Sequence, residues 1–285
     1  MLSKVEFKKL NRPVSIIPFL LLMGDWMLIL CGIFLLKSPL TFAFGFLLLM
    51  RQQLSLSVMM HEGVHNLLLE NKRMNDLLGI FFCSGPILSH FHGYRNLHMK
   101  HHRHALSSED PGQYLLKSHR ESPRAFILDI LKDLSFITYI SLGFKVDTGK
   151  ITKTALALNL LGQVFGLIMV WVLFKLFGLS FSYYIFCWVI PLVTIHQVVL
   201  RIRALMEHGG FSYHKEAEAC NRSVKAGWVT KILAPHNINY HIEHHLYPTI
   251  PSYRLVHISK KLSFNNREES YGNALKSLFM TSASK

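Results

Sequence analysis

The sequence has few charged residues and few cysteines, and each shortage excludes a class of protein. Asp, Glu, Lys and Arg make up 17% of its 285 residues, against roughly 25% in an ordinary soluble domain. The hydrophobic share is 50%, which is too high for a chain that stays unfolded in water. The four cysteines form no spacing motif, so neither a disulfide framework nor a cysteine-ligated zinc site is predicted.

Acidic residues are the scarcer charged class, with 17 Asp and Glu against 31 Lys and Arg and a net charge of +14. An excess of this size is compatible with nucleic acid or with a membrane surface as partner. The basic segments flank long apolar runs, which favours anionic lipid headgroups and argues against nucleic acid. Histidine is abundant by contrast. The 17 histidines equal all the acids together and are the first indication of function.

Four apolar runs are long enough to cross a bilayer, because about 20 residues of helix, rising ~1.5 Å each, span the ~30 Å hydrocarbon core. The runs are residues 15–36, 38–60, 155–174 and 181–200. Residue 37 alone separates the first two runs, and residues 175–180 separate the last two. The sequence therefore predicts four transmembrane helices arranged as two hairpins.

The distribution of basic residues predicts how these hairpins are oriented. All but three of the 31 Lys and Arg lie in the N-terminal tail, the middle loop and the C-terminal region; the exceptions are Lys37, Arg51 and Lys175. The positive-inside bias places the three basic segments on the cytoplasmic face. The expected location is a bacterial cytoplasmic membrane.

The segments between and after the hairpins complete the predicted architecture. Residues 77–91 and 125–142 are apolar but too short or too interrupted to cross, so we expect interfacial or re-entrant helices there. The prediction is a single all-α membrane domain over residues 1–285. In it, residues 61–154 and 201–260 form a cytoplasmic helical cap rich in histidine.

Three histidine clusters lie in the regions predicted to face the cytoplasm. Their members are His61 and His65, then His98, His101 and His102, and finally His241, His244 and His245. Positions i, i+3 and i+4 share one face of a helix, so each cluster can direct two or three imidazoles at one point. Imidazole at this spacing suits iron, zinc, copper or nickel, and the clusters together predict a metal site.

The number of imidazoles indicates more than one metal ion. A mononuclear zinc site needs about three or four protein ligands, whereas the clusters offer eight imidazoles. His208 is a ninth candidate, because it lies eight residues after the fourth run, or ~12 Å along a helix. Glu62 and Glu243, inside the first and third clusters, are expected to orient ligand imidazoles rather than to bind metal.

The first cluster also matches HExxH, the zinc-protease motif in which Glu62 would act as general base. That alternative needs a further ligand on another span, for which Asp25 is the candidate. Asp25 lies near the middle of its predicted span, whereas His61 lies at the cytoplasmic end of the next one. An intramembrane zinc protease would leave the second and third clusters without a role. It remains a remote alternative. A metal-binding or transport protein without catalysis is a further alternative.

In these histidines and their flanks, the chain resembles the membrane fatty acid desaturase family and its hydroxylase and carotenoid-oxygenase relatives. The resemblance runs from about His61 to Arg254. The segments that carry it, besides the clusters, are residues 71–79, 94–97, 105–111, 201–209 and 239–248, followed by Ile250 and Pro251.

The resemblance implies a non-haem di-iron oxygenase that uses O2 and takes two electrons from a separate carrier. The implied iron ligands are His61, His65, His98, His101, His102, His208, His241, His244 and His245. The implied reaction is insertion of a double bond into the chain of an acyl lipid or fatty acyl thioester. Hydroxylation or ketolation of an acyl lipid or carotenoid at the same site is the alternative. No fused haem domain precedes the spans, so the implied electron donor is an external ferredoxin or small haem cytochrome.

Overall fold

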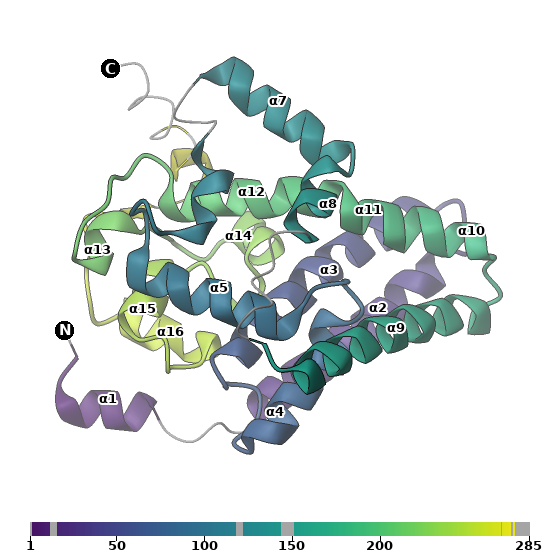
Figure 1. Cartoon of the computed structure of the whole chain (residues 1–285), viewed down its shortest axis with the longest axis horizontal. Coiled ribbons are helices and arrows are strands. Elements are labelled where there is room, and N and C mark those ends of the chain that lie inside the picture. The colour runs from purple at the N-terminus through teal and green to yellow at the C-terminus, as the bar shows by residue number, and fades with distance from the viewer. Residues whose placement is uncertain are drawn as a thin grey trace. The chain divides into compact units, whose positions relative to one another are not determined.

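The computed structural model describes residues 2–11, 16–117, 122–143, 151–268, 270–274 and 276, and this part of the chain is mostly helical (Figure 1). Ser15, the predicted first residue of the first span, lies outside the described residues, as do residues 118–121 and 144–150 of the predicted cap. The chain divides into two compact units. Unit 1 consists of Met1–Pro13, Asn96–Lys132 and Val198–Lys285; unit 2 consists of Val14–Arg95 and Asp133–Gln197.

Four helices of the described chain are long and apolar enough to cross a membrane, which confirms the predicted number. They are α2 (Ile17–Leu35), α3 (Phe42–Val64), α9 (Lys153–Leu176) and the composite helix Phe181–His208. The first turn is longer than predicted, because α3 begins only at Phe42. The Thr41 hydroxyl donates to the Leu35 carbonyl (2.7 Å) and so closes the turn between α2 and α3.

The fourth apolar run is a broken helix. It consists of α10 (Phe181–Tyr184), the π-helix η4 (Ile185–Val189), α11 (Ile190–Val193) and α12 (Ile195–His208). Pro191 has no N–H to donate, and Thr194 departs from helical geometry with φ −124° and ψ −86°. Side chains supply hydrogen bonds to backbone carbonyls along this broken helix. The Thr194 hydroxyl donates to Ile190 O (2.6 Å), and the Gln53 amide donates to Trp188 O (2.7 Å). The last helix then continues beyond the apolar run as far as His208.

The remaining elements are short. They are α1 (Lys4–Leu10), α4 (Lys72–Leu78), the π-helix η1 (Gly79–Ser84), α5 (Phe91–His104), the 3-10 helix η2 (Pro111–Leu115), α7 (Pro123–Leu134), α8 (Ile137–Gly143), α13 (Ala217–Cys220), α14 (Trp228–Leu233), the 3-10 helix η5 (Pro235–Asn237), α15 (His241–Leu246) and α16 (Ser252–Ser259). A two-stranded parallel sheet joins β1 (Ser223–Val224) to β2 (Arg267–Glu268).

The two shorter apolar pieces are not single helices. Residues 77–91 extend from the end of α4 through η1 to the first residue of α5. Residues 125–142 divide between α7 and α8, where Phe136 adopts a left-handed conformation with φ +66°. A non-glycine residue rarely takes this conformation, and it ends a helix because the following residues leave the helical path.

The core of unit 2 lies between its long helices. Helix α2 packs along α3 (Figure 1). Both α3 and α9 contact η1. The fully buried side chains at this core include Phe91, Phe174 and Trp188. The outer faces of α2 and α9 keep large apolar side chains exposed, among them Met27 and Leu160 at 61% each. Exposed apolar surface of this kind suits contact with lipid.

Glycines let η1 and the residues after it approach α9 closely. A Cβ added to Gly85 would lie 2.2 Å from the Gly162 carbonyl oxygen, and one added to Gly166 would lie 2.3 Å from the Pro86 nitrogen. Small residues at such crossings are typical of helices that pack in lipid, where close backbone contact contributes much of the attraction. These positions therefore fix the distance between the two segments.

Unit 1 has two smaller apolar clusters. One lies around Leu205, Met206 and Val224, and the other around Tyr240, Leu255 and Ile258. The N-terminal helix α1 adds Leu2, Phe7 and Leu10 to the second cluster, and the Leu2 amide donates to the Tyr247 hydroxyl (2.8 Å). The N-terminal segment therefore packs against Tyr247, two residues after the third histidine cluster.

Candidate metal centre

Four histidines from three helices converge in unit 1 and form what we call the four-histidine group. They are His101 of α5, His208 of α12, and His241 and His245 of α15, and one nitrogen of each lies within 4.8 Å of the others. The Nε2 of His241 lies 3.0 Å from that of His208 and 3.1 Å from that of His245. Such spacing suits neighbouring ligands around one transition-metal ion.

Hydrogen bonds on the outer side of two rings determine which nitrogen carries the proton. The Cys220 carbonyl can only accept, so His208 donates to it from Nδ1 (3.3 Å), and the Nε2 of His208 carries a lone pair. His101 likewise directs Nδ1 at the Asp110 carboxylate (2.9 Å). The single N–H that His241 could place on Nε2 cannot point at His208 and His245 at once. Converging lone pairs repel one another, and a cation among them removes the repulsion.

The contacts of the Asp110 carboxylate favour its ionised form. It is fully buried and accepts hydrogen bonds from the backbone amides of Leu106 and Gly112 (2.8 Å each) as well as from His101. Burial alone would raise its pKa, but the His101 hydrogen bond and charge, together with the two amides, hold the pKa below its usual value. The result is the carboxylate–histidine pair that commonly supports a metal ligand.

Three further histidines of unit 1 form a second set, the three-histidine group. His102 of α5 lies between His98 of α5 and His244 of α15, with Nε2–Nε2 distances of 3.0 Å to each. His98 and His244 are buried. This set has the same short nitrogen spacing as the four-histidine group and suits a metal ion for the same reason.

The histidines of the first cluster lie in unit 2, at the end of α3. His61 is the fourth residue from the end of the helix, His65 is its C-cap, and their rings are 4.9 Å apart. Glu62 Oε1 lies 3.7 Å from His61 Nδ1, beside the ring that it is expected to orient. Burial and the positive charge of Arg95 lower the pKa of His65 to about 3. The imidazole of His65 is therefore neutral at ordinary pH, which is the form that binds metal.

Comparison with known proteins agrees with this arrangement. Residues 37–270, most of the chain, match the family model described as fatty acid desaturase. The chain belongs to the fatty acid desaturase family. One relative, dihydrorhizobitoxine desaturase of Bradyrhizobium elkanii, is 24% identical over 237 residues, which cover 76% of this chain and 66% of the relative. The chain thus spans just under two thirds of that relative's length.

The second and third histidine clusters of this desaturase-family chain do not each point at one place, contrary to the sequence-based expectation. In each cluster the residues at i and i+4 share a group, whereas the residue at i+3 belongs to the other group. Consecutive residues are turned by about 100° around a helix, so positions i+3 and i+4 diverge by that angle and face different neighbours. Each cluster therefore contributes to both groups.

Glu243 is held away from a ligand role. Its buried carboxylate accepts from the Ser223 hydroxyl (2.5 Å) and from Arg267 (2.6 Å), and the Ser223 oxygen accepts from the Ile242 amide (2.9 Å). These bonds tie α15 to β1 and β2. Glu243 therefore positions the helix that carries the third cluster, whereas the contacts that orient single rings come from Asp110 and the Cys220 carbonyl.

Two carboxylates beside the histidines were not predicted as site residues. Asp110 is the partner of His101, and Glu207 lies with Oε2 3.9 Å from His241 Nε2 while its Oε1 accepts from Arg203 (2.6 Å). The available signal was proximity in sequence, because Glu207 directly precedes His208 and Asp110 follows the second cluster within a segment that resembles the family. Proximity alone does not say which way a side chain points.

The structure does not support Asp25 as the third ligand of the zinc-protease alternative. Asp25 is buried and accepts from Gln52 (3.1 Å) and from Ser55 (2.7 Å), with Arg51 at 3.7 Å. Ser55 precedes His61 by six residues, which is ~9 Å of helix. Both groups of candidate metal ligands in the described residues consist of histidine alone.

Replacing Asp110 with Asn tests the role of the carboxylate at His101. An amide lacks the negative charge and can present its NH2 group to Nδ1, so we expect metal affinity to fall about 10–100-fold, as for other partners of metal-bound histidines. Titration of the metal-free protein with Co(II), followed by its absorption spectrum, measures the change. Glu109→Gln is the matched control, because the Glu109 side chain is 64% exposed. Equal Co(II) affinity in Asp110→Asn and Glu109→Gln would show that Asp110 has no such role.

Proposed function

We propose that the protein is a membrane-bound, non-haem di-iron desaturase that introduces a double bond into the chain of an acyl lipid or fatty acyl thioester. The observation that carries the proposal is the convergence of seven imidazoles of unit 1 into two sets. Neighbouring Nε2 atoms of six of them lie 3.0–3.1 Å apart, and His101 has a ring nitrogen within 4.8 Å of those of its group. Family membership supports the same conclusion, since the family name itself denotes the reaction.

The two sets support a proposed assignment of ligands to two ions. In the proposal, one iron is held by the four-histidine group, His101, His208, His241 and His245. The other is held by His98, His102 and His244. His61 and His65 of unit 2 are proposed as further ligands of the iron pair, because the resemblance to the family implies them. Histidine ligation without carboxylates distinguishes this centre from the Glu-rich di-iron sites of soluble helical bundles.

The protein contributes placement and shielding to the reaction. When bound, the iron pair supplies the O2 chemistry that removes two hydrogens from an unactivated pair of carbons, with two electrons from an external ferredoxin or small haem cytochrome. The imidazoles, which are buried or half-buried, hold the ions, and their burial limits the access of bulk water to the oxidising centre. The apolar helices accept the hydrocarbon chain, and the basic segments face anionic headgroups or an acidic donor at the cytoplasmic surface.

Metal and product analysis test the proposal together. We expect purified protein to contain two iron ions per chain and to consume O2 when a reduced donor and substrate are supplied. Mass spectrometry of host lipids after expression should show acyl chains that have lost two hydrogens. One zinc per chain with cleaved peptides would support the protease instead, and metal binding without O2 consumption would contradict any oxygenase.

Two alternatives at the same site are separated by the product. A hydroxylase or ketolase of acyl lipids or carotenoids would add an oxygen atom instead of removing two hydrogens. The similarity to dihydrorhizobitoxine desaturase makes dihydrorhizobitoxine a second substrate to test in the same assay. Conversion of that compound with no change in acyl lipids would replace the lipid substrate in the proposal.

A further inference from the structure

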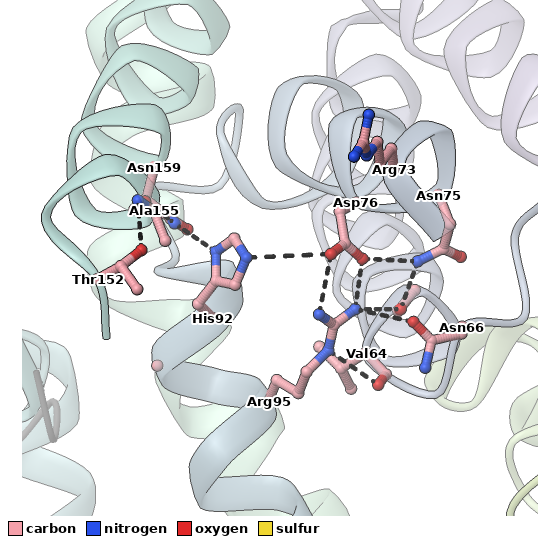
Figure 2. A network of polar contacts seen from close by, with 12 residues as sticks. Val64, Asn66, Arg73, Asn75, Asp76, His92, Arg95, Thr152, Ala155 and Asn159 are labelled. Atoms are coloured by element: carbon pink, nitrogen blue, oxygen red, sulfur yellow. Dashed lines mark hydrogen bonds and ion pairs between the residues drawn. The ribbon is translucent and has the colours of Figure 1, made fainter. Parts of the chain in front are cut away.

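The end of α3 is held by an arginine from the next histidine-bearing helix. Arg95 of α5 donates from Nη2 to the Gly63 carbonyl (3.1 Å), from Nε to the Val64 carbonyl (3.1 Å) and from Nη2 to the Asn66 side-chain oxygen (3.3 Å) (Figure 2). The two carbonyls lie in the two residues before His65, and the side-chain oxygen belongs to the residue after it. One guanidinium therefore holds the backbone before a proposed metal ligand and the side chain that follows it.

This contact satisfies a general need of helix ends. The last carbonyls of a helix have no partner further along the helix, and they take hydrogen bonds from side chains or from a turn. Here the turn is made by Asn66, which adopts the left-handed conformation with φ +61°. The conformation that ends α3 and the arginine that bonds its carbonyls together determine where His65 lies at the end of the helix.

Asp76 of α4 holds Arg95 in place. Its two oxygens accept from Nη1 (3.1 Å) and Nη2 (2.6 Å), and the two side chains are 18% and 17% exposed (Figure 2). Burial alone would raise the pKa of Asp76, but the hydrogen bonds and charge of Arg95 hold it below its usual value. Phe91 supports the guanidinium from its other side, with its ring centre 4.8 Å from Arg95 Cζ. The arginine is thus fixed by an ionised partner and an aromatic face.

Neighbouring amides and a histidine extend the same network. Asn75 donates to the Gly63 carbonyl (2.8 Å) and to Asp76 (3.0 Å), and its side-chain oxygen accepts from the Leu68 amide (3.0 Å). On the other side, His92 Nε2 lies 4.0 Å from Asp76, and His92 Nδ1 accepts from Asn159 of α9 (2.7 Å) (Figure 2). The carboxylate is therefore bonded by Asn75 of its own helix and lies near His92 of α5, whose ring is in turn bonded by α9.

We propose that Arg95, fixed by Asp76, is a positioning residue for His65 and so controls the affinity of one of the two metal ions. The inference rests on the proposed function, because it needs His65 to be a ligand. The planar guanidinium reaches two carbonyls and a carboxylate at once, which the ammonium of a lysine cannot do in the same geometry. The effect is on the ion that takes His61 and His65, and the other ion is unaffected.

If Arg95 only capped the end of α3, its loss would lower the stability of the fold and would not weaken one metal ion selectively. The experiment therefore measures metal binding and unfolding together. The full-length protein is purified, stripped of metal and titrated anaerobically with Fe(II) against a chelator, so that two binding steps are resolved. In Arg95→Gln we expect one step to weaken about 10–100-fold, the usual effect of removing a partner that orients a metal ligand. The other step and the unfolding temperature of the metal-free protein should stay close to the unchanged protein.

Further variants separate charge from geometry. Arg95→Lys keeps the positive charge but loses the planar guanidinium that bonds several acceptors at once. It should therefore weaken the same Fe(II) binding step by less than Arg95→Gln does. Asp76→Asn removes the carboxylate that fixes Arg95 and should weaken that step as well. Arg73→Gln is the matched control, because Arg73 is an exposed arginine of the same helix as Asp76, and it should change neither step. If Arg95→Gln fails to fold, the two conservative variants carry the test.

Each result has a distinct meaning. Two Fe(II) steps of unchanged strength in Arg95→Gln, or in both Arg95→Lys and Asp76→Asn, would overturn the inference and leave the proposed function intact. Equal weakening of both Fe(II) binding steps together with a lower unfolding temperature would also overturn it. That result would show that Arg95 only stabilises the fold at the end of α3. A wild-type protein that binds no pair of ions would contradict the proposed function itself.

Discussion

Replacing His245 with Ala is expected to abolish turnover and to remove one iron from the purified protein. His245 supplies one of four imidazoles in its group, with Nε2 3.1 Å from that of His241, and its ring also lies 4.3 Å from the ring of His102. Loss of a partner that only orients a ligand costs about 10–100-fold in affinity or activity, so loss of a ligand should cost more than about 100-fold. Iron analysis and acyl-chain mass spectrometry measure both effects.

His257→Ala is the matched control for this variant. His257 lies on α16 and is exposed, so its removal takes away an imidazole without touching either histidine group. It should keep two iron ions and full turnover, and both variants should insert into the membrane equally well. Full activity in His245→Ala would count decisively against the proposed ligand set.

Replacing Gly166 with Ala is expected to destabilise the fold by about 3 kcal/mol, the upper part of the usual range for overpacking. A Cβ at this position would lie 2.3 Å from the Pro86 nitrogen and 2.4 Å from the Gly85 carbonyl carbon. Both are backbone atoms, so a side-chain rotation cannot relieve the clash and the two segments must separate. Thermal unfolding of the detergent-solubilised protein should show a clear fall in midpoint temperature.

Gly24→Ala is the matched control in unit 2, because Gly24 has space for a side chain. Gly24 lies inside α2, and a Cβ there would meet no atom within 4 Å. Alanine is the better helix former by about 0.5–1 kcal/mol, so this variant should be as stable as the unchanged protein or slightly more so. Similar unfolding midpoints for the two variants would mean that the close approach at Gly166 does not limit stability.

Much of the site could be predicted because its signals are local. The spacing of His98, His101 and His102 is a helical pattern, and helices satisfy their own backbone, so short stretches of sequence suffice to recognise them. The same holds for the long apolar runs. The exact ends were less predictable, since the start of α3 at Phe42 depends on a turn that the Thr41 hydroxyl closes.

The partners of these residues could not be predicted in the same way. Asp110, Glu207 and Arg95 all lie within segments that resemble the family, but the sequence alone assigns a role to none of them. Each acts through contacts that depend on side-chain direction, such as the bonds from Arg95 to the carbonyls at the end of α3, about 30 residues earlier in the chain. Asp25 is a candidate metal ligand in the sequence, but the structure shows that its carboxylate accepts hydrogen bonds from Gln52 and Ser55 of the next helix.

The amino-acid sequence by itself determined the helical class, the four apolar helices and the family, because each of these follows from composition, periodicity and motifs read along the chain. Only the tertiary structure decided how the histidines are shared, with His101 in one group and its neighbours His98 and His102 in the other. The physical reason is that a helix turns by about 100° at each residue, so the partner that each side chain meets depends on which other helix packs against that face.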